Sequence, residues 1–411
     1  MHAGRTCLVR WDVGEAPAAR QEAARDIGAG TIMVFGVETA RNPIPVQGQV
    51  TVPQVKGAHG MLFSKVSPVE SAGFAGNGIR WNLRVLRGGT SVPMVPSGQP
   101  SASGGNEMRV VELDHEDADA IKAAVHELGA VPELDDVTVA EATLLGQELP
   151  RTIRQLLLAY RDGGEDILVL RHAATGLALE AGPTPATWDR PDPPSGIDLA
   201  FTMLATLVGE PMRISHFQNH RVVHEVLPMP DQATKQVGTS SEVTLELHTE
   251  AAFSTLIPDV LTLIGVRNDG QVPTILASTA RLDLTDPAFD ELFDDTVLAE
   301  VDDPHSYTCR AGALYGLRDN PCLNFDSIYH EELSQRPRPA ALQLLREQLT
   351  RVAEPVVLEA GDLVFFDNRR VVHGRPVFGA RYDGSDRWLK RIMLASGYRR
   401  LAPYCAGRLV P

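Results

Sequence analysis

The sequence predicts a mainly β fold with a closed or two-sheet β core braced by helices. From about residue 210 onward, short apolar runs alternate with turn residues, which is typical of many short strands. Residues 108–208 instead show helical periodicity on both sides of one continuous apolar run. Strands that follow a helical start bury their apolar faces well as a β core with helices on its outside.

The composition is ordinary for a globular protein and excludes several classes. Of the 411 residues, 43% are hydrophobic and 22% charged, which excludes collagen-like, disulfide-scaffold and wholly disordered chains. The net charge of −15 argues against generic attraction to nucleic acid or to an anionic membrane. No apolar run approaches the roughly 20 residues of a membrane span. We therefore expect neither a nucleic-acid partner nor a membrane partner.

The cysteine pattern predicts a cytoplasmic protein. Cys7, Cys309, Cys322 and Cys405 form no CxxC pair, which is typical of reduced thiols. The N-terminal residues Met-His-Ala-Gly-Arg lack the apolar core of a signal peptide. The sequence does not indicate an oligomeric state.

Residues 1–107 differ from the rest of the chain and are expected to form an extension. They hold apolar pieces at 31–37 and 61–66 without a sustained period, and they end in a Gly/Ser/Pro stretch at 96–105 typical of a flexible linker. Met108 then opens a strand-like run. Either Met108 is the natural start and the preceding residues are a misassigned upstream translation, or the extension is genuine. Residues 108–411 are expected to form the main domain.

The elements of this domain follow from local patterns. Helices are expected at Asp117–Leu128, Ile153–Ala159 and Ile197–Val208, where apolar residues recur at helical spacing, and a buried strand at Asp166–Arg171. Later strands are expected at Arg221–Leu227, Val243–Leu247, Val260–Val266, Thr274–Ala277, Val356–Leu358, Leu363–Phe366 and Ile392–Ser396. Helical segments at Pro287–Phe293 and Ala340–Val352 interrupt them.

The run 242–250 predicts a strand with potential metal ligands, because its apolar residues alternate with polar ones. Residues two apart on a strand face the same side, so His248 and Glu250 would project together, ~7 Å apart along the backbone. The histidine-x-acid pattern also occurs at His115, which begins an acidic helix start, and at His330, which begins an exposed helical stretch. A half-buried strand histidine without metal is the alternative for His248.

A second candidate element spans residues 361–375, where a strand leads through a polar turn to a short strand ending in His373. Two histidines and one carboxylate on one face, with positions left open, are the arrangement used for oxygen activation at Fe(II). Arg387 lies fourteen residues further on, where a return strand would bring it alongside His373. Its guanidinium would clamp a carboxylate bidentately and so position a keto-dicarboxylate cosubstrate. A surface salt bridge is the alternative role for Arg387.

Three motifs together resemble the clavaminate synthase-like branch of the Fe(II)/2-oxoglutarate dioxygenases. They are His248-Thr-Glu250, Asp367-Asn-Arg-x-x-x-His-Gly-Arg375 and Asp386-Arg-Trp-Leu-x-Arg391. Their order and the histidine-to-arginine spacing match together over residues 108–411. This branch includes the β-hydroxylases of free arginine, asparagine and lysine in antibiotic pathways. It carries Glu in the first motif, where most of the wider superfamily has Asp.

The resemblance implies a double-stranded β-helix, a jelly roll, with flanking helices. It implies that His248, Glu250 and His373 ligate iron, and that Arg387, assisted by Thr274, binds the distal carboxylate of 2-oxoglutarate. The implied reaction consumes dioxygen, decarboxylates 2-oxoglutarate to succinate and hydroxylates an unactivated C–H bond.

The resemblance also implies contacts to a small-molecule amino-acid substrate. Arg391 would hold the α-carboxylate and Glu250 would touch the α-amine, while Gln218 and Asp326 would face the side chain. Ser240 or its neighbour would donate one hydrogen bond. Ordinary loop polarity is the alternative for these last three positions.

The sequence leaves several amino acids as candidate substrates. The arginine hydroxylases place two acidic residues one apart in the segment of Asp326, and here Ser327 and Ile328 follow instead. Lysine, ornithine, asparagine and other polar amino acids therefore remain candidates. A histidine series at residues 216, 220 and 224 has helical spacing but runs into a predicted strand, so we interpret it as incidental.

Three alternative functions remain. The same cofactors also support desaturation, cyclisation or oxidation of a carrier-bound or modified amino acid. A metal-free jelly-roll binding protein belongs to another class. A zinc hydrolase would also use two histidines and a glutamate, but the HExxH pattern is absent and the Arg387 spacing would be unexplained.

Overall fold

The computed structural model describes residues 108–190, 192–215, 217–252, 256–293, 296–298, 309–327, 339–403, 405 and 408–410, and three short strands before them. The chain divides into two compact units, Met1–Pro96 and Ser97–Pro411. In the first, β1 (Arg25–Asp26), β2 (Thr31–Met33) and β3 (Val50–Thr51) form an antiparallel sheet. The predicted linker, His216 and His330 lie outside the described residues.

The second unit is built on two sheets. The larger has the order β4-β5-β17-β10-β19-β6, with β8 also paired to β19. Its strands are β4 (Arg109–Glu112), β5 (Ile167–Arg171), β6 (Glu210–Pro211), β8 (His224–Val226), β10 (Val260–Arg267), β17 (Leu363–Asp367) and β19 (Trp388–Ala395). All pairs are antiparallel except β4 with β5.

The smaller sheet has the order β16-β11-β18-β9, so β9 is its edge strand. Its members are β9 (Leu245–His248), β11 (Thr274–Ser278), β16 (Glu354–Val356) and β18 (Val371–Arg375). Three short pairs lie outside both sheets: β12 (Thr296–Leu298) with β13 (Cys309–Ala311), β14 (Leu314–Leu317) with β15 (Asn320–Leu323), and β7 (Arg213–Ile214) with β20 (Leu409–Val410).

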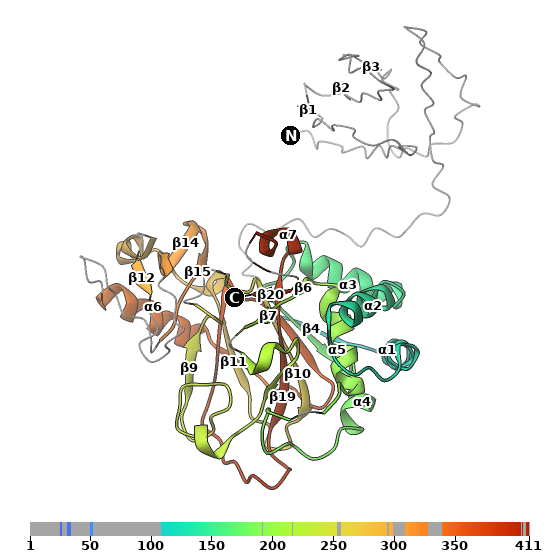
Figure 1. The fold of residues 1–411 in the computed structure, drawn as a ribbon. Coiled ribbons are helices and arrows are strands. Elements are labelled where there is room, and N and C mark those ends of the chain that lie inside the picture. Colours follow the sequence, from blue (N-terminus) through green and yellow to red (C-terminus); the bar gives the residue numbers. More distant parts are fainter. Residues whose placement is uncertain are drawn as a thin grey trace. The chain divides into compact units, whose positions relative to one another are not determined.

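Helices cover the outside of this core (Figure 1). They are α1 (His115–Leu128), α2 (Asp136–Gly146), α3 (Arg151–Arg161), α4 (Thr175–Leu179), α5 (Gly196–Thr206), α6 (Pro339–Val352) and α7 (Tyr398–Leu401). The first turns of α1 and α2 are capped by Asp114 and Asp135, whose carboxylates accept backbone N–H groups. None of the helices described is long and apolar enough to cross a membrane.

The continuous apolar runs of the large sheet are explained by burial on both faces. On β17, Leu363 and Phe365 pack with the helices, while Val364 and Phe366 pack into the space between the two sheets. A third apolar cluster joins the outer face of the small sheet to α6, β14 and β15. Strand side chains alternate between faces, so a run without polar residues indicates apolar layers on both sides.

The predicted mainly β core with flanking helices is confirmed, with differences at some boundaries. The predicted strand 221–227 is reduced to β8, and Pro287–Phe293 is a 3₁₀ helix. The α2 helix is not predicted by periodicity, because Val137 and Leu144 are exposed and Val139 is buried among β-branched neighbours that favour strands.

Candidate active site

The two histidines of the motifs meet across the small sheet. His248 is the last residue of β9, and His373 lies on β18 directly opposite it in the strand register. Their ring centroids are 4.2 Å apart. Facing positions on adjacent antiparallel strands bring side chains into contact, so the pairing of β9 with β18 brings the two imidazoles together.

Glu250 joins them from outside the strand. Simple strand alternation is wrong for this residue, because β9 ends at His248 and Glu250 lies in the turn that follows. Its Oε2 is nevertheless 3.5 Å from Nε2 of His373. One ligand atom from each of the three residues lies within 4.8 Å of the others. Backbone contacts of the turn, rather than β periodicity, aim the carboxylate at the histidines.

The charge states of His373 and Glu250 suit a divalent metal. Burial and the nearby His248 lower the pKa of His373 to about 4, so its imidazole is neutral at pH 7. Burial alone would raise the pKa of Glu250, but the positive charge of Arg391 and the contact with His373 hold it well below its ordinary value. Nδ1 of His248 lies 2.9 Å from the carbonyl oxygen of Glu246, which leaves Nε2 as a ligand atom. Two imidazoles and a carboxylate fit Fe(II).

Arg387 and Thr274 form a second group in the same cavity. Arg387 immediately precedes β19, is 8% exposed, and donates from Nη2 to Oγ1 of Thr274 at 3.2 Å. Burial, aided by the charge of Arg375, lowers the pKa of Arg387 to about 9, so it remains a cation at pH 7. Its Nε is buried without a hydrogen-bond partner. A buried guanidinium with an unsatisfied donor fits a bound carboxylate.

Arg391 connects the triad to the large sheet. Its Nη1 donates to Oε2 of Glu250 at 2.8 Å, and its guanidinium lies over Phe217, 5.6 Å from the ring centroid. Nη2 lies 3.4 Å from Nδ1 of His224, which faces Arg391 in the β8–β19 register. Burial lowers the pKa of His224 to about 3, so it is a neutral neighbour. Interpreting His224 as incidental overlooked this contact.

The predicted substrate residues differ in their placement. Gln218 and Asp326 line the cavity, and Asp326 forms a backbone bridge with His248. The Gln218 amide accepts from the backbone N–H of Glu225 and donates to its carbonyl, each at 2.8 Å. Ser240 is absent from the cavity wall, because its hydroxyl donates to the carbonyl of Val237 and accepts from Arg375.

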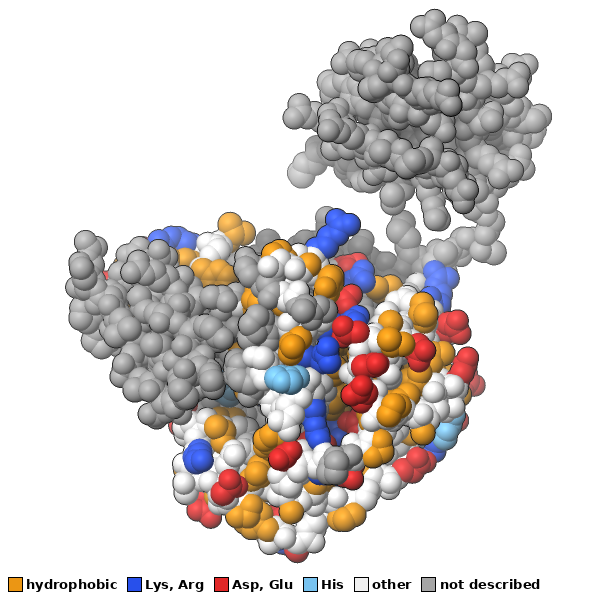
Figure 2. Space-filling view, viewed as in Figure 1, with side chains coloured by type: hydrophobic (Ala, Val, Ile, Leu, Met, Phe, Trp, Pro, Cys, Tyr) orange, Lys and Arg blue, Asp and Glu red, His pale blue; other side chains and the backbone are white. Residues whose placement is uncertain are grey.

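The cavity has a volume of about 350 Å³, within the usual range for small-molecule sites. Its polar wall joins both sheets, with His248, Glu250, Thr274, Asp326, His373, Arg375, Arg387 and Arg391. On the outer face in view, Lys and Arg side chains are interspersed with Asp and Glu (Figure 2).

Arg375 is a wall residue to which motif reasoning gave no role. Its Nη atoms donate to the Ser240 hydroxyl and to the carbonyls of Val243 and Pro376, and its guanidinium lies over the ring of Phe378. Within the described part of the chain, no carboxylate forms an ion pair with it. The sequence did contain an indication that Arg375 lines the cavity. Arg375 lies two residues after His373 on β18, and strand alternation puts both side chains on one face.

A buried charge cluster supports the strand that carries Arg391. Lys390 is 1% exposed, and its Nζ lies 2.7 Å from Asp198 and 3.0 Å from Glu225. Glu225 also accepts from Nε1 of Trp388 at 2.6 Å and from Arg190 at 3.1 Å. These contacts join β8, β19 and α5 behind the cavity. Sequence patterns do not reveal them, since they depend on strand register.

Comparison with known proteins places the chain in a family. Residues 198–393 match the family model "Taurine catabolism dioxygenase TauD, TfdA family". The chain is 32% identical over 331 residues to the enduracididine beta-hydroxylase of Streptomyces hygroscopicus, spanning 71% of this chain and 96% of that relative. It is 29% identical to the L-asparagine oxygenase of Streptomyces coelicolor over 305 residues, spanning 71% of this chain and 90% of the relative.

Comparison with solved structures points to the same family. The non-heme iron oxygenase OrfP, in complex with Fe, succinate and (3S)-hydroxy-L-Arg, superposes with a TM-score of 0.67 at 28% identity, covering 74% of this chain and 100% of OrfP. This likeness confirms the predicted jelly-roll fold. The chain therefore belongs to the TauD/TfdA family of non-haem iron, 2-oxoglutarate-dependent dioxygenases.

Proposed function

We propose that this chain hydroxylates an unactivated C–H bond of an L-amino acid with a basic or polar side chain. One observation carries the proposal: a single cavity joins the His248, Glu250 and His373 cluster to the Arg387–Thr274 pair and to Arg391. The cavity thus offers separate positions for a metal, a dicarboxylate and an amino acid.

The small sheet supplies most of the metal and cosubstrate contacts. His248, Glu250 and His373 ligate Fe(II), and Arg387 with Thr274 binds the distal carboxylate of 2-oxoglutarate. When bound, iron and 2-oxoglutarate activate dioxygen for attack on the C–H bond. The neutral imidazole of His373 and the ionised carboxylate of Glu250 need no proton transfer before they bind the metal. Burial of Arg387 excludes water from its guanidinium and strengthens the carboxylate contact.

The large sheet supplies the amino-acid contacts. Arg391 holds the α-carboxylate of the substrate, and its contact with Glu250 and Phe217 keeps the guanidinium turned toward the metal ligands. Glu250 also lies where an α-amine would reach it. These contacts orient one C–H bond toward the iron, which is the main contribution of protein side chains to such a reaction.

Gln218 and Asp326 contact the substrate side chain. Hydrogen bonds to Glu225 use one N–H of the Gln218 amide, so a second N–H remains for the substrate. The relatives named enduracididine beta-hydroxylase and L-asparagine oxygenase, and OrfP in complex with (3S)-hydroxy-L-Arg, support a polar or basic substrate. Enduracididine and clavaminate relatives support a role in specialised-metabolite biosynthesis. The free thiols of Cys322 and Cys405 support a cytoplasmic location.

The test is a substrate screen with metal-reconstituted protein. Anaerobically purified protein receives Fe(II), 2-oxoglutarate, ascorbate and then air, together with each amino acid, ornithine, citrulline and enduracididine. We expect succinate and one hydroxylated product from a polar or basic amino acid, and neither from His373→Ala. The exposed His220→Ala variant is the matched control.

The outcomes separate the parts of the proposal. Succinate that forms slowly without a hydroxylated product, and only when His373 is present, would contradict a free amino-acid substrate and favour a carrier-bound one. Absence of both metal binding and succinate formation would overturn the enzyme function and leave a jelly-roll binding protein.

A further inference from the structure

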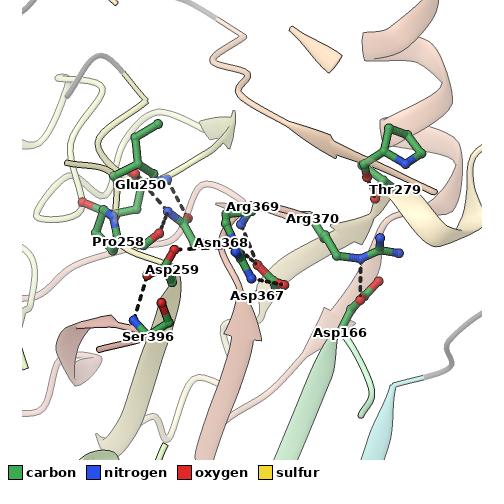
Figure 3. Close-up of polar contacts among 12 residues, drawn as sticks. Asp166, Glu250, Pro258, Asp259, Thr279, Asp367, Asn368, Arg369, Arg370 and Ser396 are labelled. Carbon is green, nitrogen blue, oxygen red and sulfur yellow. Dashed lines mark hydrogen bonds and ion pairs between the residues drawn. The ribbon is translucent and has the colours of Figure 1, made fainter. Parts of the chain in front are cut away.

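The turn between β17 and β18 holds the backbone of Glu250. Asn368 in this turn is 0% exposed. Its Oδ1 accepts the backbone N–H of Glu250 at 2.9 Å, and its Nδ2 donates to the carbonyl of Glu250 at 3.1 Å (Figure 3). The same Nδ2 donates to the carbonyl of Pro258 at 3.0 Å. One side-chain amide thus satisfies both backbone polar groups of Glu250.

Glu250 needs this support because it lies beyond the strand. Among the residues that the structure describes, no strand pairs with Glu250, and the next residue, Ala251, adopts a left-handed φ of 53°. Buried backbone groups require partners. The contacts of Asn368 thus fix the backbone of Glu250, while Arg391 and His373 contact its carboxylate.

The turn is itself rigidly anchored. The backbone N–H of Asn368 donates to the carbonyl of Asp259 at 2.9 Å, and that of Asp367 donates to the carbonyl of Asp166 at 2.9 Å. Nε of Arg370 donates to the Asp166 carboxylate at 2.7 Å (Figure 3). Asn368 therefore connects the backbone of Glu250 to a turn that these contacts hold in place.

The same turn leads directly into β18, which carries His373 five residues after Asn368. The turn is thus connected to His373 through the chain and to Glu250 through the side-chain amide of Asn368. We propose that Asn368 is a positioning residue that sets the distance between Glu250 and His373 and thereby the metal affinity. This inference rests on the proposed function, which makes both residues metal ligands.

Only an asparagine amide meets the geometric demand. The contact needs one acceptor and two N–H donors on a short side chain. Asn368→Asp keeps the size but replaces the donors with oxygen, which faces the carbonyls of Glu250 and Pro258. Asn368→Ser shortens the side chain and leaves one O–H donor in place of the two N–H donors, without adding charge. Asn268→Ser is the matched control, because the buried Asn268 amide makes the same kind of contacts, accepting from the backbone N–H of Val272 and donating to the carbonyls of Val272 and Leu358, without touching Glu250.

The experiment measures Mn(II) affinity by electron paramagnetic resonance on the full chain, with thermal unfolding in parallel. We expect both Asn368 variants to weaken Mn(II) binding about 10- to 100-fold, as loss of outer contacts to metal ligands typically does. Asn268→Ser is expected to lower the unfolding temperature while its Mn(II) affinity stays within about threefold of wild type.

Three results would overturn the inference or its premise. Mn(II) affinity of a folded Asn368 variant that equals that of wild type would overturn the positioning role. An equal loss of Mn(II) affinity in Asn268→Ser at equal loss of stability would also overturn it, because the effect would then be general destabilisation. A wild-type protein that binds Mn(II) no better than His373→Ala would instead overturn the proposed metal site.

Discussion

The two sheets contribute different chemistry to the cavity and hold it in different ways. The small sheet offers the two histidines and Thr274, whose positions come from strand register. The large sheet offers Arg391, with Arg387 directly before β19, and behind them lies the cluster of Lys390 with Asp198 and Glu225. Strand register alone positions the two histidines, whereas buried cations also require counter-charges or a bound anion. We therefore call the small sheet the preorganised half, because its site residues are in place before a ligand binds. The large sheet is the charged half, because its buried cations need counter-charges or bound anions.

Breaking the preorganised half should have the largest effect. His373→Ala removes one of three metal ligand candidates and opens a gap opposite His248. We expect Mn(II) affinity to fall by more than the roughly 100-fold typical of outer contacts, with little change in fold. Calorimetric titration checks this, and affinity retained near the wild-type value would contradict the ligand role.

Breaking the charged half should instead reduce stability. Lys390→Met leaves Asp198 and Glu225 buried without their shared cation, and loss of one member of a buried pair typically costs about 3–5 kcal/mol of unfolding free energy. Urea unfolding of wild type and variant measures the difference. A variant as stable as wild type would mean that the cluster is dispensable.

The pH dependence of that difference follows from the pKa of Lys390. Burial alone would lower this pKa, but the carboxylates of Asp198 and Glu225 raise it above 10.5. A raised pKa gives stability that is present below the unfolded value and lost as pH rises through the folded one. The stability gap should therefore be constant around pH 7–9 and shrink only in stronger alkali.

Substitutions of Arg387 and Arg391 should affect the binding of two different ligands, 2-oxoglutarate and the amino acid. Arg387→Gln is expected to raise KM for 2-oxoglutarate, and Arg391→Gln to raise KM for the amino acid, each about 10- to 100-fold, as expected for a lost charge-assisted hydrogen bond. Steady-state kinetics with each substrate varied in turn checks this. The same KM rising in both variants would refute the division.

The smallest effect is expected from the N-terminal residues. We propose that residues 108–411 suffice for activity, because every described residue of the cavity wall lies in that range. A chain that starts at Met108 should keep metal affinity and kcat/KM within about twofold, since surface changes away from the site are usually near neutral. Loss of metal binding on truncation would place the domain boundary elsewhere.

The sequence predicts those parts of the site that local spacing encodes. His248, His373 and Arg387 stand in short motifs, and the structure brings them to one cavity. Glu250 was expected from strand alternation, yet a distant amide at Asn368 holds its backbone. His224 and Lys390 depend on the pairing of β8 with β19, which joins segments over 160 residues apart. No local pattern specifies such a register, so these contacts require the three-dimensional structure.

Because β9 is the edge strand of the small sheet, its local stability should depend on whether the metal site is occupied. β9 pairs with β18 alone within the small sheet, and His248 is its last residue. An ion held by His248 and His373 would fasten this outer strand to its neighbour, so binding free energy would become local folding free energy. Amide hydrogen exchange in β9 should then slow when metal is added and should remain unchanged in the interior strands. Strand protection would serve as a measure of occupancy without any turnover.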